Sequence, residues 1–328
     1  HEHVPSVNVL IVGAGSVGQV YAHHLSKAGD TVTFYVRPKY RRPIESGLLL
    51  HHTTYFGTHT EDHQCRHAIT TLKDVTAQSW DEVWLAVTST SLQGEWLPAL
   101  LRAADAMAVV TLQPGLRTRR RLARLIPESQ IVTGAIGFLA WQAPLPSEDI
   151  TNTGIRYWFP PLVRSQFSGP MDKVHTIVRR LRQSGCPAEK SRDAANWAAI
   201  PSAILMPHIA GLELENWSIE QFRKSTTLPI SLQASREAIA VATAYFKIRK
   251  PFYVRLLTPI TMRLSLWLLP RLAPFNIEGF LWQHFTKIGD QTRDLILEYI
   301  RESDYQSQKN DGLGTLNQRL ALRLREPQ

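Results

Sequence analysis

The stretch VNVLIVGAGSVG, residues 7–18, decides the fold of this chain. It opens with the apolar run Val7–Val12, which has the length of a fully buried strand. A helical pattern follows from Val17 to Ala28, Gly29-Asp30 interrupts it, and the β-rich run Thr31–Val36 comes next. Strand, helix and strand at this spacing predict a βαβ unit with parallel strands and a right-handed crossover.

The turn between the first strand and the helix has the pattern GxGxxG. The first glycine permits a tight turn, the second lets the backbone approach a pyrophosphate, and the third lets the helix pack close to the sheet. The positive N-terminus of the helix then holds the pyrophosphate. A glycine turn without a ligand is the alternative. We predict that a dinucleotide binds at Gly13, Ala14, Gly15, Ser16, Val17 and Gly18.

The end of the second strand selects the nucleotide. Sites for NAD usually carry Asp or Glu there, to hold the ribose 2′-hydroxyl. This chain has Val36-Arg37-Pro38-Lys39 instead. A guanidinium at Arg37 can hold a 2′-phosphate and stack on adenine, and Lys39 is a second candidate for the same phosphate. The predicted cofactor is therefore NADP(H), with an Arg37 that merely faces solvent as the alternative.

Strand and helix patterns alternate further along the chain, with apolar strands at Glu82–Val87 and Ala108–Leu112. This alternation predicts an α/β fold with an N-terminal Rossmann-type doubly wound sheet. From Arg192 onward strand-like runs give way to helical patterns, which predicts an all-helical C-terminal domain. We therefore expect an NADP-binding domain over residues 1–188 and a helical substrate and dimerisation domain over residues 189–328.

Composition limits the class of protein. The 328 residues are 44% hydrophobic and 20% charged, which is ordinary for globular domains. No uninterrupted apolar run reaches about 18 residues, so we expect no membrane span. Cys65 and Cys186 form no disulfide framework and no secretion signal precedes the first strand, which favours the cytoplasm. The segment His1-Glu2-His3 is interpreted as a flexible or added end, and no metal site is expected.

The formal net charge of +9 is compatible with nucleic acid, an anionic membrane or a phosphorylated ligand. Most basic residues are dispersed, and the densest cluster, Arg117–Arg124, is interpreted as a solvated helix face. The helix expected at Asp172–Gln183 also has a basic face. The chain shows neither zinc-finger spacing nor an RNA-binding signature, so we expect no nucleic-acid partner.

These motifs resemble the ketopantoate reductase family (2-dehydropantoate 2-reductases). The family begins with the same GxGxxG unit, ends its second strand with Arg, and joins a Rossmann domain to an all-helical domain. The turn after Glu82–Val87 matches the family except that Thr90 replaces a Lys, and Gln113-Pro114-Gly115 replaces Gln-Asn-Gly. The resemblance implies that further residues flank the cofactor, namely Thr88, Ser89, Gln93, Gln113 and Gly115.

The resemblance breaks at the catalytic residues. Aligned without gaps on Pro207, the family's general-acid Lys falls on Ala198 and its two Asn fall on Ser202 and Met206. No lysine occurs from Ser191 to Arg223, so a small shift of the alignment restores none. The family's later Glu falls on Ala273. The chain is thus interpreted as a divergent member that lacks the catalytic Lys.

Reduction of a carbonyl or imine needs a hydride and a nearby proton source. His208 is the nearest titratable residue to the lost Lys and could donate a proton, although a packed helix histidine is the alternative. Ser202 could replace an Asn hydrogen bond to substrate, and Glu278 lies where the family has site residues. We therefore name His208, Ser202 and Glu278 as catalytic candidates.

The segment from Phe252 to Phe285 is rich in Leu, Trp, Phe and Pro. We expect it to pack in the core or in a homodimer interface of the helical domain. Two alternatives are an apolar pocket for a bulkier substrate and a membrane-surface role, with Arg255, Arg263 and Arg271 facing lipid phosphates.

The sequence therefore predicts an NADPH-dependent oxidoreductase of the ketopantoate reductase superfamily. The substrate is expected to be a small organic carbonyl or imine other than ketopantoate, held between the domains and receiving a hydride from nicotinamide C4. Two alternatives remain open. One is a catalytically silent NADP(H)-binding sensor or scaffold, and the other is a non-redox enzyme on the same fold.

Overall fold

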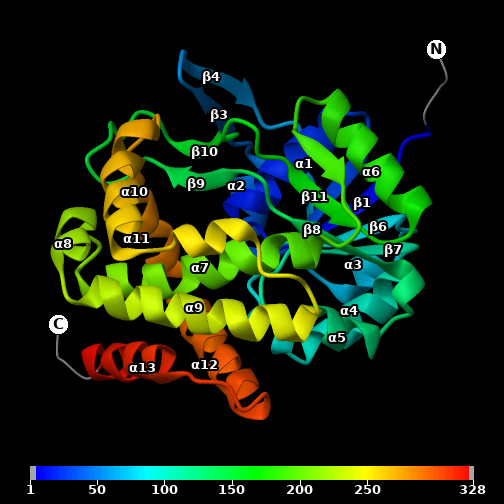
Figure 1. Ribbon diagram of the computed structural model, residues 1–328. Helices are drawn as coiled ribbons and strands as arrows, with labels where there is room; N and C mark the ends of the chain where they lie inside the picture. The colour runs from blue at the N-terminus through cyan, green and yellow to red at the C-terminus, as the bar shows by residue number, and fades with distance from the viewer. Residues whose placement is uncertain (1–4, 325–328) are drawn as a thin grey trace. The chain divides into compact units, whose positions relative to one another are not determined.

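The computed structural model describes residues 5–324, and the segment His1-Glu2-His3 lies outside this range (Figure 1). The chain divides into two compact units. The first contains His1–Gln113 and Arg117–Ala195, and the second contains Pro114–Leu116 and Asn196–Gln328. The predicted boundary at residues 188 and 189 falls inside a strand of the first unit, a few residues before this division.

An eight-stranded sheet forms the centre of the first unit, in the order β12-β11-β8-β7-β6-β1-β2-β5. Its strands are β1 (Asn8–Val12), β2 (Thr31–Tyr35), β5 (Ala68–Ile69), β6 (Glu82–Leu85), β7 (Ala108–Thr111), β8 (Ile131–Ala135), β11 (Ser165–Ser168) and β12 (Ala188–Lys190). Neighbouring strands are parallel except β8 and β11, which are antiparallel. Helices or one-turn helices connect most of them: α1 (Ser16–Lys27), η1 (Pro38–Tyr40), α2 (Arg41–Glu45), α3 (Leu72–Thr76), η2 (Ser91–Gln93), α4 (Trp96–Ala104), α5 (Thr118–Ala123), η3 (Glu128–Gln130) and α6 (Met171–Gln183).

Both faces of β1 are buried. Val9 and Ile11 belong to one apolar cluster together with residues of α1 and α6, whereas Leu10 and Val12 belong to another with residues of α4. Successive side chains of a strand point to opposite faces, so a strand covered on both sides reads as a continuous apolar run. The predicted doubly wound sheet is confirmed.

The first unit also contains a second sheet of four strands, in the order β4-β3-β10-β9, which the sequence analysis does not predict. It consists of β3 (Leu49–Thr54), β4 (Gly57–Asp62), β9 (Leu139–Ala143) and β10 (Gly154–Trp158). β3 pairs in parallel with β10, and the other two pairings are antiparallel. α1 contacts both β9 and β10, so this sheet covers the side of α1 that faces away from the main sheet.

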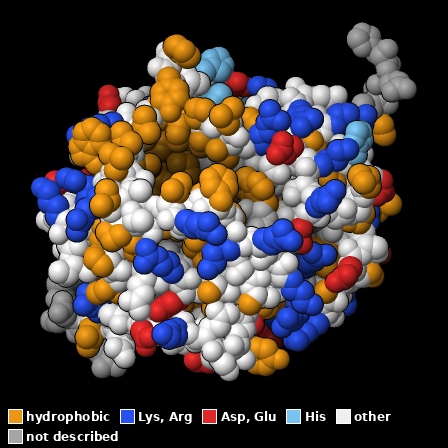
Figure 2. All heavy atoms as spheres, in the orientation of Figure 1, with side chains coloured by type: hydrophobic (Ala, Val, Ile, Leu, Met, Phe, Trp, Pro, Cys, Tyr) orange, Lys and Arg blue, Asp and Glu red, His pale blue; other side chains and the backbone are white. Residues whose placement is uncertain are grey.

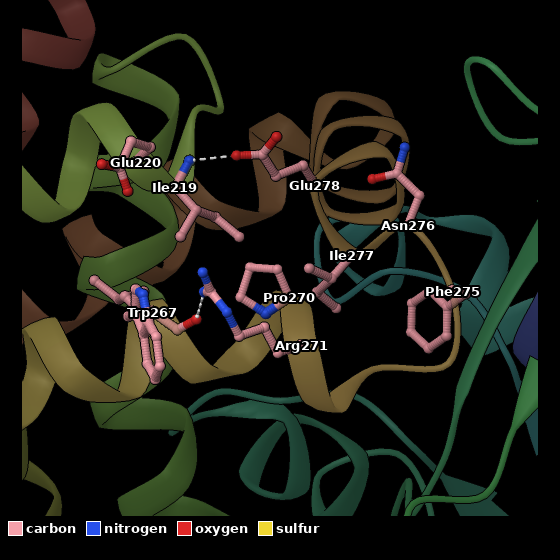
Figure 3. A pocket seen from close by; sticks show the side chains of 10 residues that line it. Ile219, Glu220, Trp267, Pro270, Arg271, Phe275, Asn276, Ile277 and Glu278 are labelled. Carbon is pink, nitrogen blue, oxygen red and sulfur yellow. Dashed lines mark hydrogen bonds between the residues drawn. The ribbon is translucent and has the colours of Figure 1, made fainter. Parts of the chain in front are cut away.

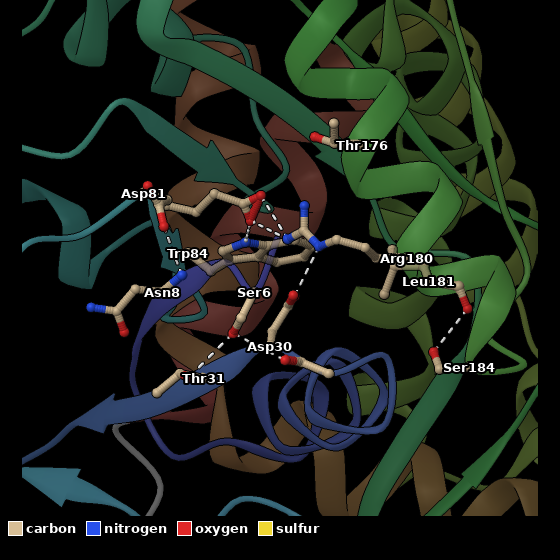
Figure 4. Close-up of polar contacts among 12 residues, drawn as sticks. Ser6, Asn8, Asp30, Thr31, Asp81, Trp84, Thr176, Arg180, Leu181 and Ser184 are labelled. Carbon is tan, nitrogen blue, oxygen red and sulfur yellow. Dashed lines mark hydrogen bonds and ion pairs between the residues drawn. The ribbon is translucent and has the colours of Figure 1, made fainter. Parts of the chain in front are cut away.

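α6 carries several basic side chains, as predicted, but one of them does not lie on its exposed face. Arg180 is fully buried, and its Nη2 donates to both carboxylate oxygens of Glu82 at 2.7 and 2.6 Å (Figure 4). Its Nε donates to Asp30 Oδ2 at 2.8 Å. Trp84 Nε1 donates to the same Glu82 carboxylate at 3.1 Å. Burial alone would lower the pKa of Arg180, but the two carboxylates raise it, so the cation is retained.

The second unit is all-helical, as predicted. Its elements are α7 (Ala194–Leu214), α8 (Ile219–Lys224), α9 (Thr227–Phe246), η4 (Phe252–Leu256), α10 (Pro259–Leu272), α11 (Ile277–Lys287), α12 (Gly289–Tyr305) and α13 (Asp311–Arg323). One apolar cluster joins α7, α9, α12 and α13. By length and composition α7 could cross a membrane, but it contains Pro201 and Pro207, and 56% of its most apolar window is buried inside the structure. Most of α7 therefore serves as a core helix of this unit.

Candidate dinucleotide-binding site

The glycine-rich turn joins the end of β1 to α1. Gly13 has φ of +103°, and a Cβ there would lie 2.6 Å from the carbonyl oxygen of Ala86. A Cβ on Gly18 would lie 2.9 Å from Ala86 Cβ, because α1 approaches the sheet closely at this point. Gly15, in contrast, has open space around its Cβ position. Gly13 makes the turn and Gly18 permits the close helix contact that the sequence predicts, and the approach of a pyrophosphate to the open backbone at Gly15 stays a prediction.

The N-terminus of α1 offers unused hydrogen-bond donors. Gly15 is the N-cap residue, and no side chain within the described residues caps the helix. The first intrahelical bond runs from the N–H of Gln19 to the carbonyl of Gly15, and the first turn contains no acidic residue. The backbone N–H groups of Ser16, Val17 and Gly18 therefore lack an intrahelical acceptor, and they lie at the positive end of the helix dipole. This is the local chemistry of an anion-binding site.

Arg37 follows the end of β2 and is exposed. Its Nη2 lies 3.5 Å from the hydroxyl of Tyr40, and its guanidinium carbon lies 5.4 Å from the centre of that ring. Lys39 Nζ lies 4.9 Å from the same ring centre. Tyr40, which sequence reasoning missed, therefore gathers both cations around one aromatic ring. The sequence could have indicated this arrangement, since the aromatic Tyr40 comes directly after Arg37 and Lys39.

The turn after β6 is held by residues outside it. Arg121 Nε donates to the carbonyl of Leu92 at 2.7 Å, and Trp96 Nε1 donates to the carbonyl of Ser91 at 3.0 Å. Thr88 Oγ1 accepts from the N–H of Ser91 at 3.2 Å. These bonds fix the loop that carries the predicted cofactor residues Thr88, Ser89 and Gln93. Arg121 belongs to the cluster that we interpreted as a solvated face, so its contacts to Leu92 and Gly94 were not anticipated.

Gln113 ties the ends of β6 and β7 together. Its Nε2 donates to the carbonyls of Leu85 and Val87, and its Oε1 accepts from Thr111 Oγ1 at 2.6 Å and from the N–H of Leu112 at 3.1 Å. These four bonds use the two donors and two acceptor positions of a primary amide. The side chain therefore shapes the edge of the predicted site, and its own amide is already occupied.

Gly115 lies with the helical unit. Its φ is +114°, and a Cβ there would lie 3.1 Å from Leu295 Cδ2. The next residue, Leu116, donates its N–H to Glu298 Oε1 at 2.6 Å. Close packing against α12 is enough to explain why a glycine occupies this position. A contact between Gly115 and the cofactor stays a prediction.

Two catalytic candidates lie on α7. Ser202 is half-buried, and His208 is buried. His208 Nδ1 lies 2.7 Å from the carbonyl oxygen of Ile204, so this nitrogen carries the hydrogen, while Nε2 has no hydrogen-bond partner among the described residues. Burial lowers the pKa of His208, so the neutral ring is favoured. This arrangement is the packed helix histidine that the sequence analysis named as the alternative.

The third candidate, Glu278, lines a pocket of about 240 Å³ between α8, α10 and α11 (Figure 3). Its Oε1 accepts from the backbone N–H of Ile219 at 2.7 Å, which satisfies an N-terminal donor of α8. Trp267, Pro270 and Arg271 line the other side of this pocket. Glu278 thus has a structural bond that is independent of any substrate.

The described residues contain no group of three or more His, Cys, Asp or Glu side chains that could hold a metal ion. Both cysteines are unpaired and buried. Burial raises the pKa of the Cys65 thiol to about 12, and it raises the pKa of the Cys186 thiol as well. Neither thiol is therefore a nucleophile near neutral pH.

Residues 9–144 match the family described as Ketopantoate reductase PanE/ApbA. No protein of curated function matches the chain at a significant level. Among solved structures, a PanE/ApbA family ketopantoate reductase from Ralstonia eutropha JMP134 has 20% identity and a TM-score of 0.73, with 97% of each chain covered. A 2-dehydropantoate 2-reductase from Methylococcus capsulatus has 15% identity and a TM-score of 0.71, covering 98% of this chain and 99% of its own.

A D-mandelate dehydrogenase, solved with NADH and anilino(oxo)acetate, has 13% identity and a TM-score of 0.73, covering 96% of this chain and 97% of its own. At these identities the structural likeness shows the fold alone, and the family match covers residues 9–144. The matched family and these solved structures are described as reductases or dehydrogenases. Residues 9–144 are thus similar to the ketopantoate reductase family, in line with the resemblance of their motifs.

Proposed function

We propose that the protein is an NADPH-dependent oxidoreductase that reduces a small organic carbonyl or imine other than ketopantoate. The observation that carries the proposal is the open backbone at Gly15, at the N-terminus of α1, in a unit whose second strand is followed by Arg37. The diphosphate would rest on the first N–H groups of α1, and the guanidinium of Arg37 would meet the 2′-phosphate. When bound, the nucleotide supplies a hydride from nicotinamide C4.

The choice of NADP(H) rests on charge. The D-mandelate dehydrogenase of similar fold was solved with NADH, so the fold by itself does not select NADP(H). In this chain a cation, Arg37, with Lys39 and Tyr40 beside it, occupies the region where NAD sites usually place a carboxylate. Tyr40 holds the Arg37 guanidinium near an aromatic face, which leaves it oriented for a phosphate while limiting its freedom.

The substrate class follows from what the helical unit lacks. The family's Lys falls on Ala198, and no lysine occurs from Ser191 to Arg223. Burial lowers the pKa of His208, which favours its neutral ring, and Glu278 accepts a hydrogen bond from the backbone N–H of Ile219. A substrate that needs strong acid catalysis at its oxygen is therefore disfavoured, whereas an imine that is already protonated, or an activated ketone, needs less help.

The same losses favour a second candidate function, a catalytically silent NADP(H)-binding protein. We further infer a cytoplasmic homodimer formed through the helical unit.

The experiment that separates the reductase from the silent protein follows NADPH oxidation at 340 nm over a panel of α-keto acids, ketones and cyclic imines. Turnover of a panel member above the rate with no protein supports the reductase. Saturable NADPH binding without turnover of any panel member supports the silent protein.

A further inference from the structure

A long stretch of the helical unit carries positive charge alone. Between Glu237 and Glu278 the chain contains no acidic residue. Six cationic residues lie in this stretch and all are exposed: Lys247, Arg249, Lys250, Arg255, Arg263 and Arg271. We call residues 247–272 the basic segment. It comprises the residues that follow α9, together with η4 and α10.

The basic segment also exposes apolar side chains. Phe252 is 81% exposed and Ile260 is 77% exposed, and Leu256, Leu264, Trp267 and Leu272 are exposed as well. Leu266 is the residue of α10 that is buried. Figure 2 shows hydrophobic side chains gathered over the position of α10, with Lys and Arg side chains on the same face of the molecule. Large apolar groups exposed together mark an interaction surface.

One face of α10 combines both kinds of side chain. Ile260, Leu264, Trp267 and Arg271 follow one another at intervals of four, three and four residues, which places them in one stripe along the helix. The Arg271 guanidinium carbon lies 4.0 Å from the centre of the Trp267 ring (Figure 3). An arginine in this position keeps its charged end in water while its hydrocarbon part packs on the aromatic ring. Side chains arranged in this way are suited to a boundary between an apolar and an aqueous phase.

The stripe is held on a rigid base. Thr258 and Thr261 form a capping box at the start of α10, with Thr258 Oγ1 accepting from the N–H of Thr261 at 3.2 Å. Arg236 of α9 donates to the carbonyl of Leu257 at 2.7 Å, which fixes the turn before the helix. The helix is therefore formed before any partner arrives, so binding has little ordering cost.

We propose that the basic segment docks the protein on the surface of an anionic lipid bilayer. The apolar side chains of η4 and α10 enter the headgroup boundary, and the six cations meet lipid phosphates. A second copy of the chain fits this surface poorly, because a two-fold contact would bring the same six cations against each other. The proposed homodimer must therefore use another face of the helical unit.

Acidic groups border the stripe on one side. Glu220 of α8 and Glu278 of α11 line the pocket beside Trp267 and Arg271. Glu220 is already paired with Arg223 and Lys224, and Glu278 accepts from the N–H of Ile219. Arg223 and Lys224 of α8 offset the negative charge of Glu220, so the net charge of the surface around α10 stays positive.

The test is flotation of the purified full chain with vesicles of phosphatidylcholine alone or of phosphatidylcholine mixed with phosphatidylglycerol, at low ionic strength. We expect binding to the anionic vesicles and none to the neutral ones. The double variant Arg255→Gln/Arg263→Gln should bind about 25-fold more weakly, at about fivefold for each cation near an anionic surface. The double variant Ile260→Ser/Leu264→Ser should also bind more weakly, because it removes the apolar anchor.

The matched control is Arg102→Gln/Arg124→Gln, which removes two exposed cations of α4 and of the end of α5 with the same change of net charge. It should bind within about twofold of the unaltered chain.

Failure of the chain to bind anionic vesicles, or an equal loss of binding in the control variant, overturns the proposal. A concentration-dependent dimer that Ile260→Ser/Leu264→Ser abolishes in ultracentrifugation also overturns it, since a second copy would then cover the stripe. Thermal melting confirms that each variant is folded.

Discussion

Arg180 Nη2 and the carboxylate of Glu82 form a fully buried ion pair, at 2.7 and 2.6 Å, that joins α6 to the start of β6. Asp30 at the start of β2 completes the group. Replacing Arg180 by Ala leaves two buried carboxylates without their cation, so we expect unfolding to become about 3 to 5 kcal/mol easier. Urea denaturation measures the change.

The control for this prediction is the exposed pair Arg164–Glu189, 3.2 Å apart. Arg164→Ala should cost less than about 1 kcal/mol, since water screens the pair. Equal losses in the two variants would mean that the buried group adds nothing beyond an ordinary surface ion pair.

Alanine substitutions at two glycines of the turn should affect different properties, nucleotide binding in one case and stability of the fold in the other. A methyl group at Gly15 meets open space at ordinary φ, so Gly15→Ala should leave stability unchanged within about 0.5 kcal/mol and weaken nucleotide binding. At Gly18 the methyl group meets Ala86 Cβ at 2.9 Å, so Gly18→Ala should destabilise the fold by about 1 to 3 kcal/mol. Thermal melts and NADPH titration of both variants separate the two effects. A loss of stability at Gly15 would refute the assignment of an open approach there.

Buried histidines predict that the fold loses stability in mild acid. Burial lowers the pKa of His24 to about 4 and that of His63 to about 3, below the value of about 6.5 in an unfolded chain. The unfolded chain therefore takes up protons first. The contribution of these two histidines to the free energy of unfolding is fully present above about pH 6.5. It decreases as the pH falls toward 4, by up to about 1.4 kcal/mol per pH unit for each histidine.

Urea denaturation at several pH values between 7 and 5 measures this slope. His24→Phe should flatten it, since a phenyl ring still packs against Tyr157 and Phe159 and takes no proton. Stability that holds constant or rises on acidification would contradict the expected sign.

The sequence predicts the parts of the fold whose causes are local. β1 and β6 are covered on both faces, so their apolar runs are visible without knowledge of their neighbours. The β3–β4 hairpin was missed because its strands are rich in His and Thr and β4 is largely exposed. The short strands β5 and β12 hold two and three residues, too few for any periodicity.

The same distinction applies to the site. The glycine turn was predictable because its pattern lies within six residues, although the contacts that require Gly13 and Gly18 come from Ala86 of a distant part of the chain. The burial of Arg180 was not, because its partners Asp30 and Glu82 lie 150 and 98 residues away in sequence. Gln113 was assigned to the cofactor by resemblance, but its bonds to Leu85 and Val87 depend on strand pairing that the sequence alone does not reveal.

The central claim is that Arg37 selects NADP(H), and calorimetric titration with NADPH and NADH tests it most directly. We expect the unaltered chain to bind NADPH more tightly than NADH, and Arg37→Ala to weaken NADPH binding by about 10- to 100-fold, as expected for the loss of a charged hydrogen bond. NADH binding should stay within about twofold, and Arg41→Ala, whose guanidinium pairs with Glu45, should change neither. Equal affinity for the two nucleotides, or an Arg37→Ala variant that keeps its NADPH affinity, would contradict the account.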